Sequence, residues 1–193
     1  MMMTDAATLV RAARKSRGLT QQRLAERTRI DQARVSRSER GRDAEFSTVA
    51  RLLAGAGHRL YSAPTQRDDA ATTAAETRAH LRAGDKERAL RALLQLNDNL
   101  VAEHGLVRGV LGLAEPELTR DRVWDAAIAG LVAWRLGEEG LPAPEWVNHP
   151  GRFLDEPRGL DVDPADPVPP LSEVPDAFAE RGVLVWRDTF ASV

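Results

Sequence analysis

The chain of 193 residues contains no cysteine, few aromatic residues (5%) and no long apolar run. Without cysteine, a disulfide framework, a thiolate zinc site and thiol catalysis are excluded. No apolar stretch approaches the roughly 20 residues that a membrane-spanning helix requires, and the N-terminus has no signal-peptide core. The length is sufficient for a hydrophobic core without a structural metal. These absences predict a globular cytoplasmic protein without a cofactor.

Common catalytic signatures are missing as well. The sequence has no G-x-x-x-x-G-K-[ST] phosphate loop, no G-x-S-x-G nucleophile elbow and no H-E-x-x-H metal motif. None of the histidines lies three or four residues from another; they are His58, His80, His104 and His149. We therefore expect no enzyme and no metal site, although a triad of residues that are distant in the chain stays open.

The formal net charge of −2 conceals two segments of opposite charge. Residues 1–62 carry 13 basic and 6 acidic side chains, a net charge of +7. Residues 63–193 carry 14 basic and 23 acidic side chains, a net charge of −9. A basic segment of this size suits a polyanionic partner, so the distribution predicts two parts with different partners.

Capping residues and apolar periodicity predict four short helices in the N-terminal third, the second over 21–28 and the third from a cap at residue 31 to about residue 40. The predicted caps are Thr4 or Asp5, Thr20, Asp31, and Asp43 or Glu45, and the predicted stops are Gly18, Gly41, Gly55 and Gly57. An extended segment over 58–61 is expected to follow.

Residues 19–41 read L-T-Q-Q-R-L-A-E-R-T-R-I-D-Q-A-R-V-S-R-S-E-R-G. A short turn between the two helices of this stretch brings Leu24, Ile30 and Val35 into one small core. The stretch resembles the helix-turn-helix of the phage repressor and Cro family, the XRE-type regulators. About ten positions match the skeleton L-T-Q-x-x-L-A, then I-x-x-x-x-V-S-R-x-E-x-G. The resemblance covers about residues 5–61 and implies a DNA-binding helical bundle.

The third predicted helix presents amide and guanidinium groups outward, and such groups pair with base edges in the major groove. The resemblance places Gln21 on the DNA backbone, where a helix N-terminus favours a phosphate. It places Gln32, Ala33 and Arg37 nearest the bases. The full set of predicted DNA contacts is Lys15, Arg17, Thr20, Gln21, Gln32, Ala33, Arg34, Ser36, Arg37 and Arg42. The alternative interpretation is a merely solvated basic face.

The resemblance also gives Arg14 and Glu39 a structural role, because these positions form an internal ion pair in several relatives. Two positions depart from the family pattern. Arg29 replaces a glycine in the turn, and Ser38 stands where relatives often have a large apolar residue. Since a positive φ costs a residue other than glycine on the order of 1 kcal/mol, we expect the departures to lower stability without removing a DNA contact.

The rest of the chain is predicted to be mostly helical up to residue 140, with helices over 69–83, 85–103, 105–114 and 119–137, the last capped by Thr119. Nine of the eleven prolines fall between Pro142 and Pro175 and interrupt regular structure. The tail after residue 175 suits a short strand or a docked helix. The predicted fold class is mainly α. The predicted divisions are an XRE-type helix-turn-helix bundle at 1–62, a linker at 63–70, and a mostly helical domain at 71–193 with a proline-rich arm over 141–175.

The excess acid of the second domain is concentrated in residues 138–180, which carry 11 acidic and 2 basic side chains. A stiff acidic arm suits a basic protein surface, because an extended segment covers a wide area and stiffness lowers the cost of ordering it. The predicted partner-binding residues are Trp146, Phe153, Asp155, Glu156, Asp161 and Asp163. Core packing is expected for Trp124 and Trp134. The alternative for the arm is a solvated loop that aids solubility.

A short XRE-type domain followed by a larger acidic domain resembles bacterial antitoxins, which bind their own operator and a toxin. The pattern P-E-W … F-L-D … P-D-A-F-A-E-R-G-V-L-V resembles antitoxins encoded with nucleotidyltransferase-like toxins. We therefore expect a homodimeric repressor, in the bacterial cytoplasm and at the nucleoid when DNA-bound. Its partners would be double-stranded DNA with an inverted-repeat operator and a cognate protein toxin. A one-component regulator with a C-terminal small-molecule sensor, or an enzyme fused to a DNA-binding module, are the alternatives.

Overall fold

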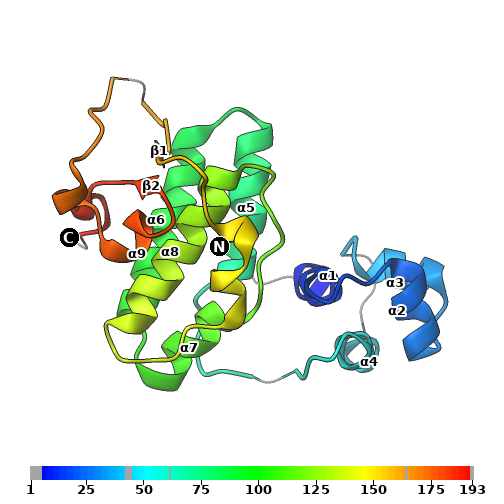
Figure 1. Cartoon of the computed structure of the whole chain (residues 1–193). Helices are drawn as coiled ribbons and strands as arrows, with labels where there is room; N and C mark the ends of the chain where they lie inside the picture. Colours follow the sequence, from blue (N-terminus) through cyan, green and yellow to red (C-terminus); the bar gives the residue numbers. More distant parts are fainter. Residues whose placement is uncertain (1–5, 42–44, 61, 164, 192–193) are drawn as a thin grey trace.

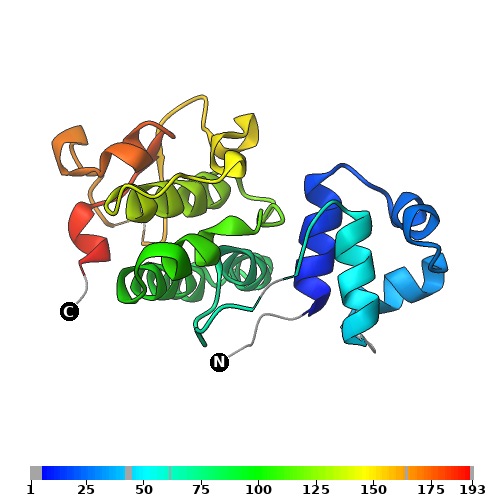
Figure 2. The same cartoon turned by 90° about the horizontal axis from the view of Figure 1, so that it is seen from below.

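A computed structural model describes residues 6–41, 45–60, 62–163 and 165–191. The described residues are mainly helical, as predicted, and their buried apolar side chains form two separate clusters. Helices α1 to α4 make a small N-terminal bundle, and helices α5 to α9 make a larger C-terminal body (Figures 1 and 2). Arg42 and the alternative caps Thr4, Asp5 and Asp43 lie outside the described residues.

The N-terminal helices start where capping side chains satisfy their first free N–H groups. They are α1 (Ala6–Ser16), α2 (Gln21–Thr28), α3 (Gln32–Ser38) and α4 (Phe46–Gly55). Thr20 Oγ1 accepts from the Arg23 N–H at 3.1 Å, and Asp31 Oδ1 accepts from the Arg34 N–H at 2.8 Å, so both predicted caps are confirmed. Glu45 stands before α4 without a side-chain cap. Helix α3 ends at Ser38, two residues earlier than predicted.

The bundle core joins all four helices through a small set of apolar side chains, chiefly Val10, Leu24, Ile30, Val35, Val49, Leu52 and Leu53. Arg29 adopts the left-handed conformation expected for the turn, with φ 53°. At Gly55 a Cβ atom would lie 2.2 Å from Thr28 Cγ2, so the close approach of α4 to α2 requires glycine there. The backbone conformation of Arg29 and the contact between Gly55 and Thr28 therefore both restrain the end of α2.

Ser38 is 1% exposed, and its hydroxyl has no hydrogen-bond partner among the described residues. Burying a hydroxyl without a partner costs free energy. Ser38→Ala should therefore raise the free energy of unfolding by about 1 kcal/mol, measured as a higher urea midpoint. Ser36→Ala, half-buried on the same helix, is the matched control and should change the midpoint little. A lower midpoint for Ser38→Ala would contradict this account.

The C-terminal body is built around α8, which is buried on nearly all sides between Trp124 and Leu136. Its long helices are α5 (Ala70–Arg82), α6 (Lys86–Ala102), α7 (Gly105–Leu113) and α8 (Arg122–Gly137). The prediction that Thr119 caps α8 is wrong. The helix begins three residues later, with Asp121 Oδ1 accepting from the Val123 N–H at 3.0 Å. The Thr119 N–H instead donates to Asp125 Oδ1 at 2.7 Å.

The proline-rich arm follows the surface of this body as a chain of short turns (Figure 1). Its described residues contain three 3₁₀ turns, at Glu145–Asn148, Pro150–Arg152 and Leu171–Glu173. Strand β1 (Arg158–Gly159) pairs in parallel with β2 (Val183–Leu184), which follows the short helix α9 (Asp176–Ala179). A last turn, Arg187–Phe190, docks on the body, where the Phe190 carbonyl accepts from Arg135 Nη2 at 3.0 Å and Asn97 Nδ2 at 3.2 Å. The tail thus contains both a strand and a docked turn.

Candidate nucleic-acid interface and partner surfaces

Helix α3 buries one face and exposes the other. Val35 and Ser38 lie inside, while Gln32, Ala33 and Arg37 are exposed. The Arg37 side chain forms no hydrogen bond or ion pair with another described residue, so its guanidinium is available for a ligand. The structure therefore brings the three residues predicted to lie nearest the bases onto one exposed face. An α-helix with this face fits the major groove of B-DNA.

A buried ion pair fixes the position of α3. Arg14 of α1 donates to both carboxylate oxygens of Glu39, from Nε at 2.5 Å and from Nη2 at 2.9 Å. Arg14 Nη1 also donates to the Leu19 carbonyl at 2.6 Å. The predicted internal pair is confirmed. Because Glu39 caps the C-terminus of α3, the pair ties this helix to α1.

Gln21, the predicted DNA-backbone contact, belongs to the same network. Its Nε2 donates to Glu39 Oε2 at 2.8 Å. An amide nitrogen carries a second hydrogen, so Gln21 keeps one donor for a phosphate. The start of α2 is thus positioned by the carboxylate that also holds Arg14.

The other predicted DNA contacts divide by their environment. Arg17 and Thr20 are exposed, and Ser36 is half-buried. Arg34 is held by α4, with Nη2 3.2 Å from Glu45 Oε2 and 2.9 Å from Thr48 Oγ1. Both contacts use Nη2 of a side chain that is 44% exposed, so the donors on Nε and Nη1 of Arg34 stay available for DNA.

The comparison with protein-family models matches residues 10–55 to the family described as helix-turn-helix. The N-terminal bundle is a helix-turn-helix domain. The match supports a DNA-binding transcriptional regulator, and it lies within the segment where the sequence predicted an XRE-type domain. Neither the curated proteins nor the solved structures give a match to this chain.

Lys15, a predicted phosphate contact, is partly exposed and also contacts the C-terminal body. Its ammonium forms an ion pair with Glu117, in the connection between α7 and α8. The same carboxylate lies 2.8 Å from Arg78 Nη1 and 3.7 Å from Arg11 Nε. Partial burial works to raise the pKa of Glu117, but hydrogen bonds from Lys15 and Arg78 and their positive charges outweigh it and lower the pKa. Glu117 therefore stays ionised and joins the helix-turn-helix domain to the body.

Glu117→Gln should lower the free energy of unfolding at neutral pH by about 1–2 kcal/mol, because it leaves three cations without their shared carboxylate. A lowered carboxyl pKa stabilises the fold above the ordinary glutamate pKa of about 4.3, and this contribution is lost as pH falls through the lowered value. The difference between wild type and variant should thus shrink below about pH 4 in urea titrations. Glu156→Gln, with a side chain 81% exposed, is the control. Equal differences at pH 7 and pH 3 would contradict this role.

The predicted partner-binding residues of the arm do not lie in one environment. Trp146 is 3% exposed and donates from Nε1 to the Gly112 carbonyl at 2.9 Å, so it packs in the core and presents no surface to a partner. Phe153 is half-buried beneath the Arg181 guanidinium, 5.0 Å from the ring centroid. The four acidic candidates are all exposed: Asp155, Glu156, Asp161 and Asp163. The acidic part of the predicted surface is accessible, and its predicted tryptophan anchor is not.

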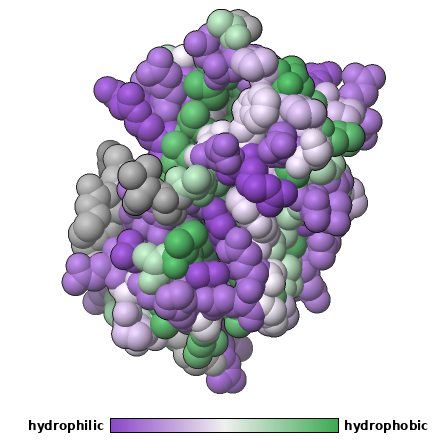
Figure 3. All heavy atoms as spheres, turned by 90° about the vertical axis from the view of Figure 1, so that its left-hand side faces the viewer, coloured by the Kyte–Doolittle hydropathy of each residue, from purple (hydrophilic) through white to green (hydrophobic). Residues whose placement is uncertain are grey.

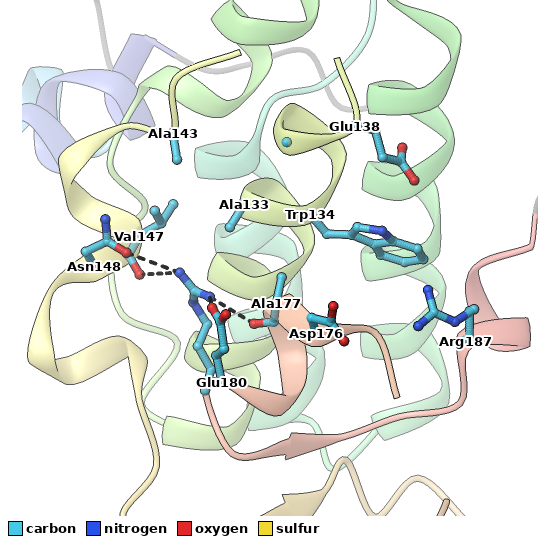
Figure 4. Close-up of a pocket in the computed structure, with 12 residues that line it drawn as sticks. Ala133, Trp134, Glu138, Ala143, Val147, Asn148, Asp176, Ala177, Glu180 and Arg187 are labelled. Atoms are coloured by element: carbon cyan, nitrogen blue, oxygen red, sulfur yellow. Dashed lines mark hydrogen bonds and ion pairs between the residues drawn. The ribbon is translucent and has the colours of Figure 1, made fainter. Parts of the chain in front are cut away.

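A pocket that the sequence did not indicate lies between α8, α9 and the arm, with a volume of about 410 Å³ (Figure 4). Trp134 and Arg187 lie on one side of it, and the carboxylates of Glu138, Asp176 and Glu180 surround it. Trp134 is half-buried and packs against the core beside Phe178 and Phe190, in agreement with the predicted packing role. The acidic residues near α8 and α9 are visible in the sequence. Nothing local in the sequence indicates that α8 and α9 lie together and form a pocket.

The surface at this end of the molecule is hydrophilic over most of its area, with small separate apolar patches (Figure 3). Within the described ranges, no group of three or more histidine or acidic residues could hold a metal ion. None of the described helices has both the length and the apolar character of a membrane span. The candidate sites are therefore the exposed face of α3 and the acidic surface of the C-terminal body.

Proposed function

We propose that this chain is a sequence-specific transcriptional repressor that reads its operator with α3. The observation that carries the proposal is the exposed face formed by Gln32, Ala33 and Arg37 in a domain whose sequence matches helix-turn-helix proteins. Arginine pairs with guanine and glutamine with adenine through two hydrogen bonds each. The other predicted contacts would hold the sugar–phosphate backbone; they are Arg17, Thr20, Gln21 and Ser36.

The repressor would act as a homodimer on an inverted repeat. One module of this size reaches only a few base pairs, and two half-sites about one helical turn apart multiply the specificity. Selection of bound sequences from random duplex DNA should therefore recover a palindrome. Recovery of a single asymmetric half-site, bound by one chain, would contradict the dimer.

We further propose that the C-terminal body binds a protein toxin, which would make the chain an antitoxin. The resemblance of the arm to antitoxins paired with nucleotidyltransferase-like toxins supports this partner. The exposed carboxylates of Asp155, Glu156, Asp161 and Asp163 favour a basic surface on it. Their placement away from α3 allows both partners to bind at once (Figure 1).

The two roles are tested by variants that separate them. The gene next to this one should encode a small protein that arrests growth unless this chain is present. Replacing Asp155, Glu156, Asp161 and Asp163 together by their amides should reduce neutralisation and leave operator affinity unchanged. Arg37→Ala should do the reverse. If a neighbouring gene product is harmless alone, or if the amide variant still neutralises it fully, the antitoxin role is refuted.

A one-component regulator with a small-molecule sensor is the second candidate. One observation favours it, namely an apolar cavity of about 550 Å³ between the helix-turn-helix domain and the C-terminal body. This volume falls within the usual range of small-molecule sites, roughly 300–1,000 Å³. A ligand at this joint would contact both the DNA-binding domain and the body.

A further inference from the structure

The cavity at the joint is lined by apolar side chains from three segments that are distant in the chain. Helix α1 contributes one wall, α4 and the segment that follows it a second, and α7 a third. The apolar lining residues are Leu9, Ala12, Ala13, Leu53, Leu60, Ala63, Pro64, Leu106, Val107, Val110, Leu113 and Ala114. Leu106 and Leu113 are 83% and 63% exposed, which is costly for a helix without an occupant beside it.

Most polar groups in the lining already have partners within the fold. Asp69 caps α5, accepting from the Thr72 N–H at 2.8 Å, and burial raises the pKa of its carboxyl group. His58 Nδ1 lies 3.0 Å from the Ala56 carbonyl oxygen, and Glu115 Oε1 lies 3.2 Å from His149 Nδ1. Arg59 differs from them, because it is exposed and forms no hydrogen bond or ion pair within the described part of the chain.

We propose that this cavity binds an aliphatic carboxylate, such as a medium-chain fatty acid. The hydrocarbon chain would lie against Leu9, Val110 and Leu113, where burial of apolar surface stabilises binding. The carboxylate would reach Arg59 at the boundary with solvent, since a guanidinium forms two parallel hydrogen bonds to a carboxylate. Small-molecule sites usually combine apolar walls with a few polar groups that fix the orientation of the ligand.

Binding here would affect the DNA-binding domain through α1. This helix supplies Leu9 and Ala12 to the cavity and Lys15 to the ion pair with Glu117, and its Arg14 holds α3 through Glu39. A ligand that changes the position of α1 would therefore act on the ion pair of Lys15 with Glu117 and on that of Arg14 with Glu39. This regulatory step rests on the proposed function, whereas ligand binding itself does not.

The test measures binding to the full-length protein without DNA. N-phenyl-1-naphthylamine, a neutral dye that fluoresces in apolar surroundings, should bind at one site per chain, and decanoate should displace it. Val110→Trp fills the cavity and should weaken dye and decanoate binding about tenfold or more. Leu171→Trp adds the same side chain at an exposed apolar position outside the cavity and should leave both affinities unchanged. Leu106→Glu, at a position that the fold leaves exposed, is a second cavity variant with the same expected loss.

The headgroup is tested separately. Arg59→Gln should weaken decanoate about tenfold and leave the dye unaffected, and decylamine should displace the dye far less well than decanoate. Unchanged dye binding in both cavity variants, or equal displacement by decylamine and decanoate, would overturn the proposal. Operator affinity with and without decanoate is then measured in a separate titration. If the chain binds no operator either with or without decanoate, the proposed function is refuted and the ligand site still stands.

Discussion

Replacing Arg37 with alanine should weaken binding to the selected operator by about 1–3 kcal/mol, or roughly 5- to 150-fold. Arg37 is exposed on α3 and has no partner within the described residues, so its truncation removes a base contact and little else. The base preference at one position of each half-site should relax at the same time. Fluorescence anisotropy titrations against the operator and its single-base variants measure both effects.

The matched control is Arg27→Ala, which removes the same charge from an exposed position of α2 outside the predicted contacts. A lost general attraction to DNA weakens binding to all sequences alike and is reduced further by salt. Arg27→Ala should therefore lower affinity slightly and leave base preference unchanged. If Arg37→Ala lowered affinity equally for operator and random DNA, Arg37 would be a phosphate contact, and the assignment of α3 as the base-reading helix would lose its main support.

Much of the helix-turn-helix domain was predictable because its determinants are local. Thr20 and Asp31 cap helices that begin directly after them, whereas the left-handed turn at Arg29 was expected from the family resemblance. The ion pair of Arg14 and Glu39 joins residues 25 apart in the sequence, and only the family resemblance indicated it. Local patterns thus predicted the elements, and resemblance supplied the contact between them.

The C-terminal body was less predictable because its contacts join distant segments. Trp146 lies in a proline-rich stretch that could equally have been exposed, and its burial depends on the Gly112 carbonyl of α7. Thr119 has the residue type of a cap, but its own N–H is taken by Asp125, which moves the helix start to Arg122. Lys15 has the charge of a phosphate contact, yet Glu117 lies 102 residues away and pairs with it. The partners of Trp146 and Lys15 are not visible from the local sequence.

The positive charge of residues 1–62 does not serve DNA binding alone. The basic N-terminal segment suits DNA, but Arg11 and Lys15 face Glu117 of the acidic segment. Part of the positive charge therefore stabilises the contact between the two bodies. Exposed arginines without an ion pair among the described residues, such as Arg17, Arg27 and Arg37, keep their charge available for DNA.

Glu39→Gln should destabilise the helix-turn-helix domain by about 3–5 kcal/mol, because it leaves the buried Arg14 guanidinium without a counter-charge. The Glu39 side chain is 4% exposed and that of Arg14 is 11% exposed, so solvent does little to replace the lost charge. A domain of this size has a total stability of about 5–15 kcal/mol, so the loss would be a large fraction of it. Urea unfolding followed by a tryptophan-independent signal, such as circular dichroism, measures the loss.

The charge itself, rather than the change of side chain, should cause this effect. Glu87→Gln removes a carboxylate that is 76% exposed and 3.7 Å from Arg91, and it should change stability by less than about 0.5 kcal/mol. Replacing Arg14 and Glu39 together by methionine leaves no unpaired buried charge and should cost far less than Glu39→Gln alone. Operator affinity should fall in both variants that lack Glu39, since Glu39 also positions Gln21. A double variant as unstable as Glu39→Gln would show that the side-chain packing of this pair, and not its charge, holds α3 in place.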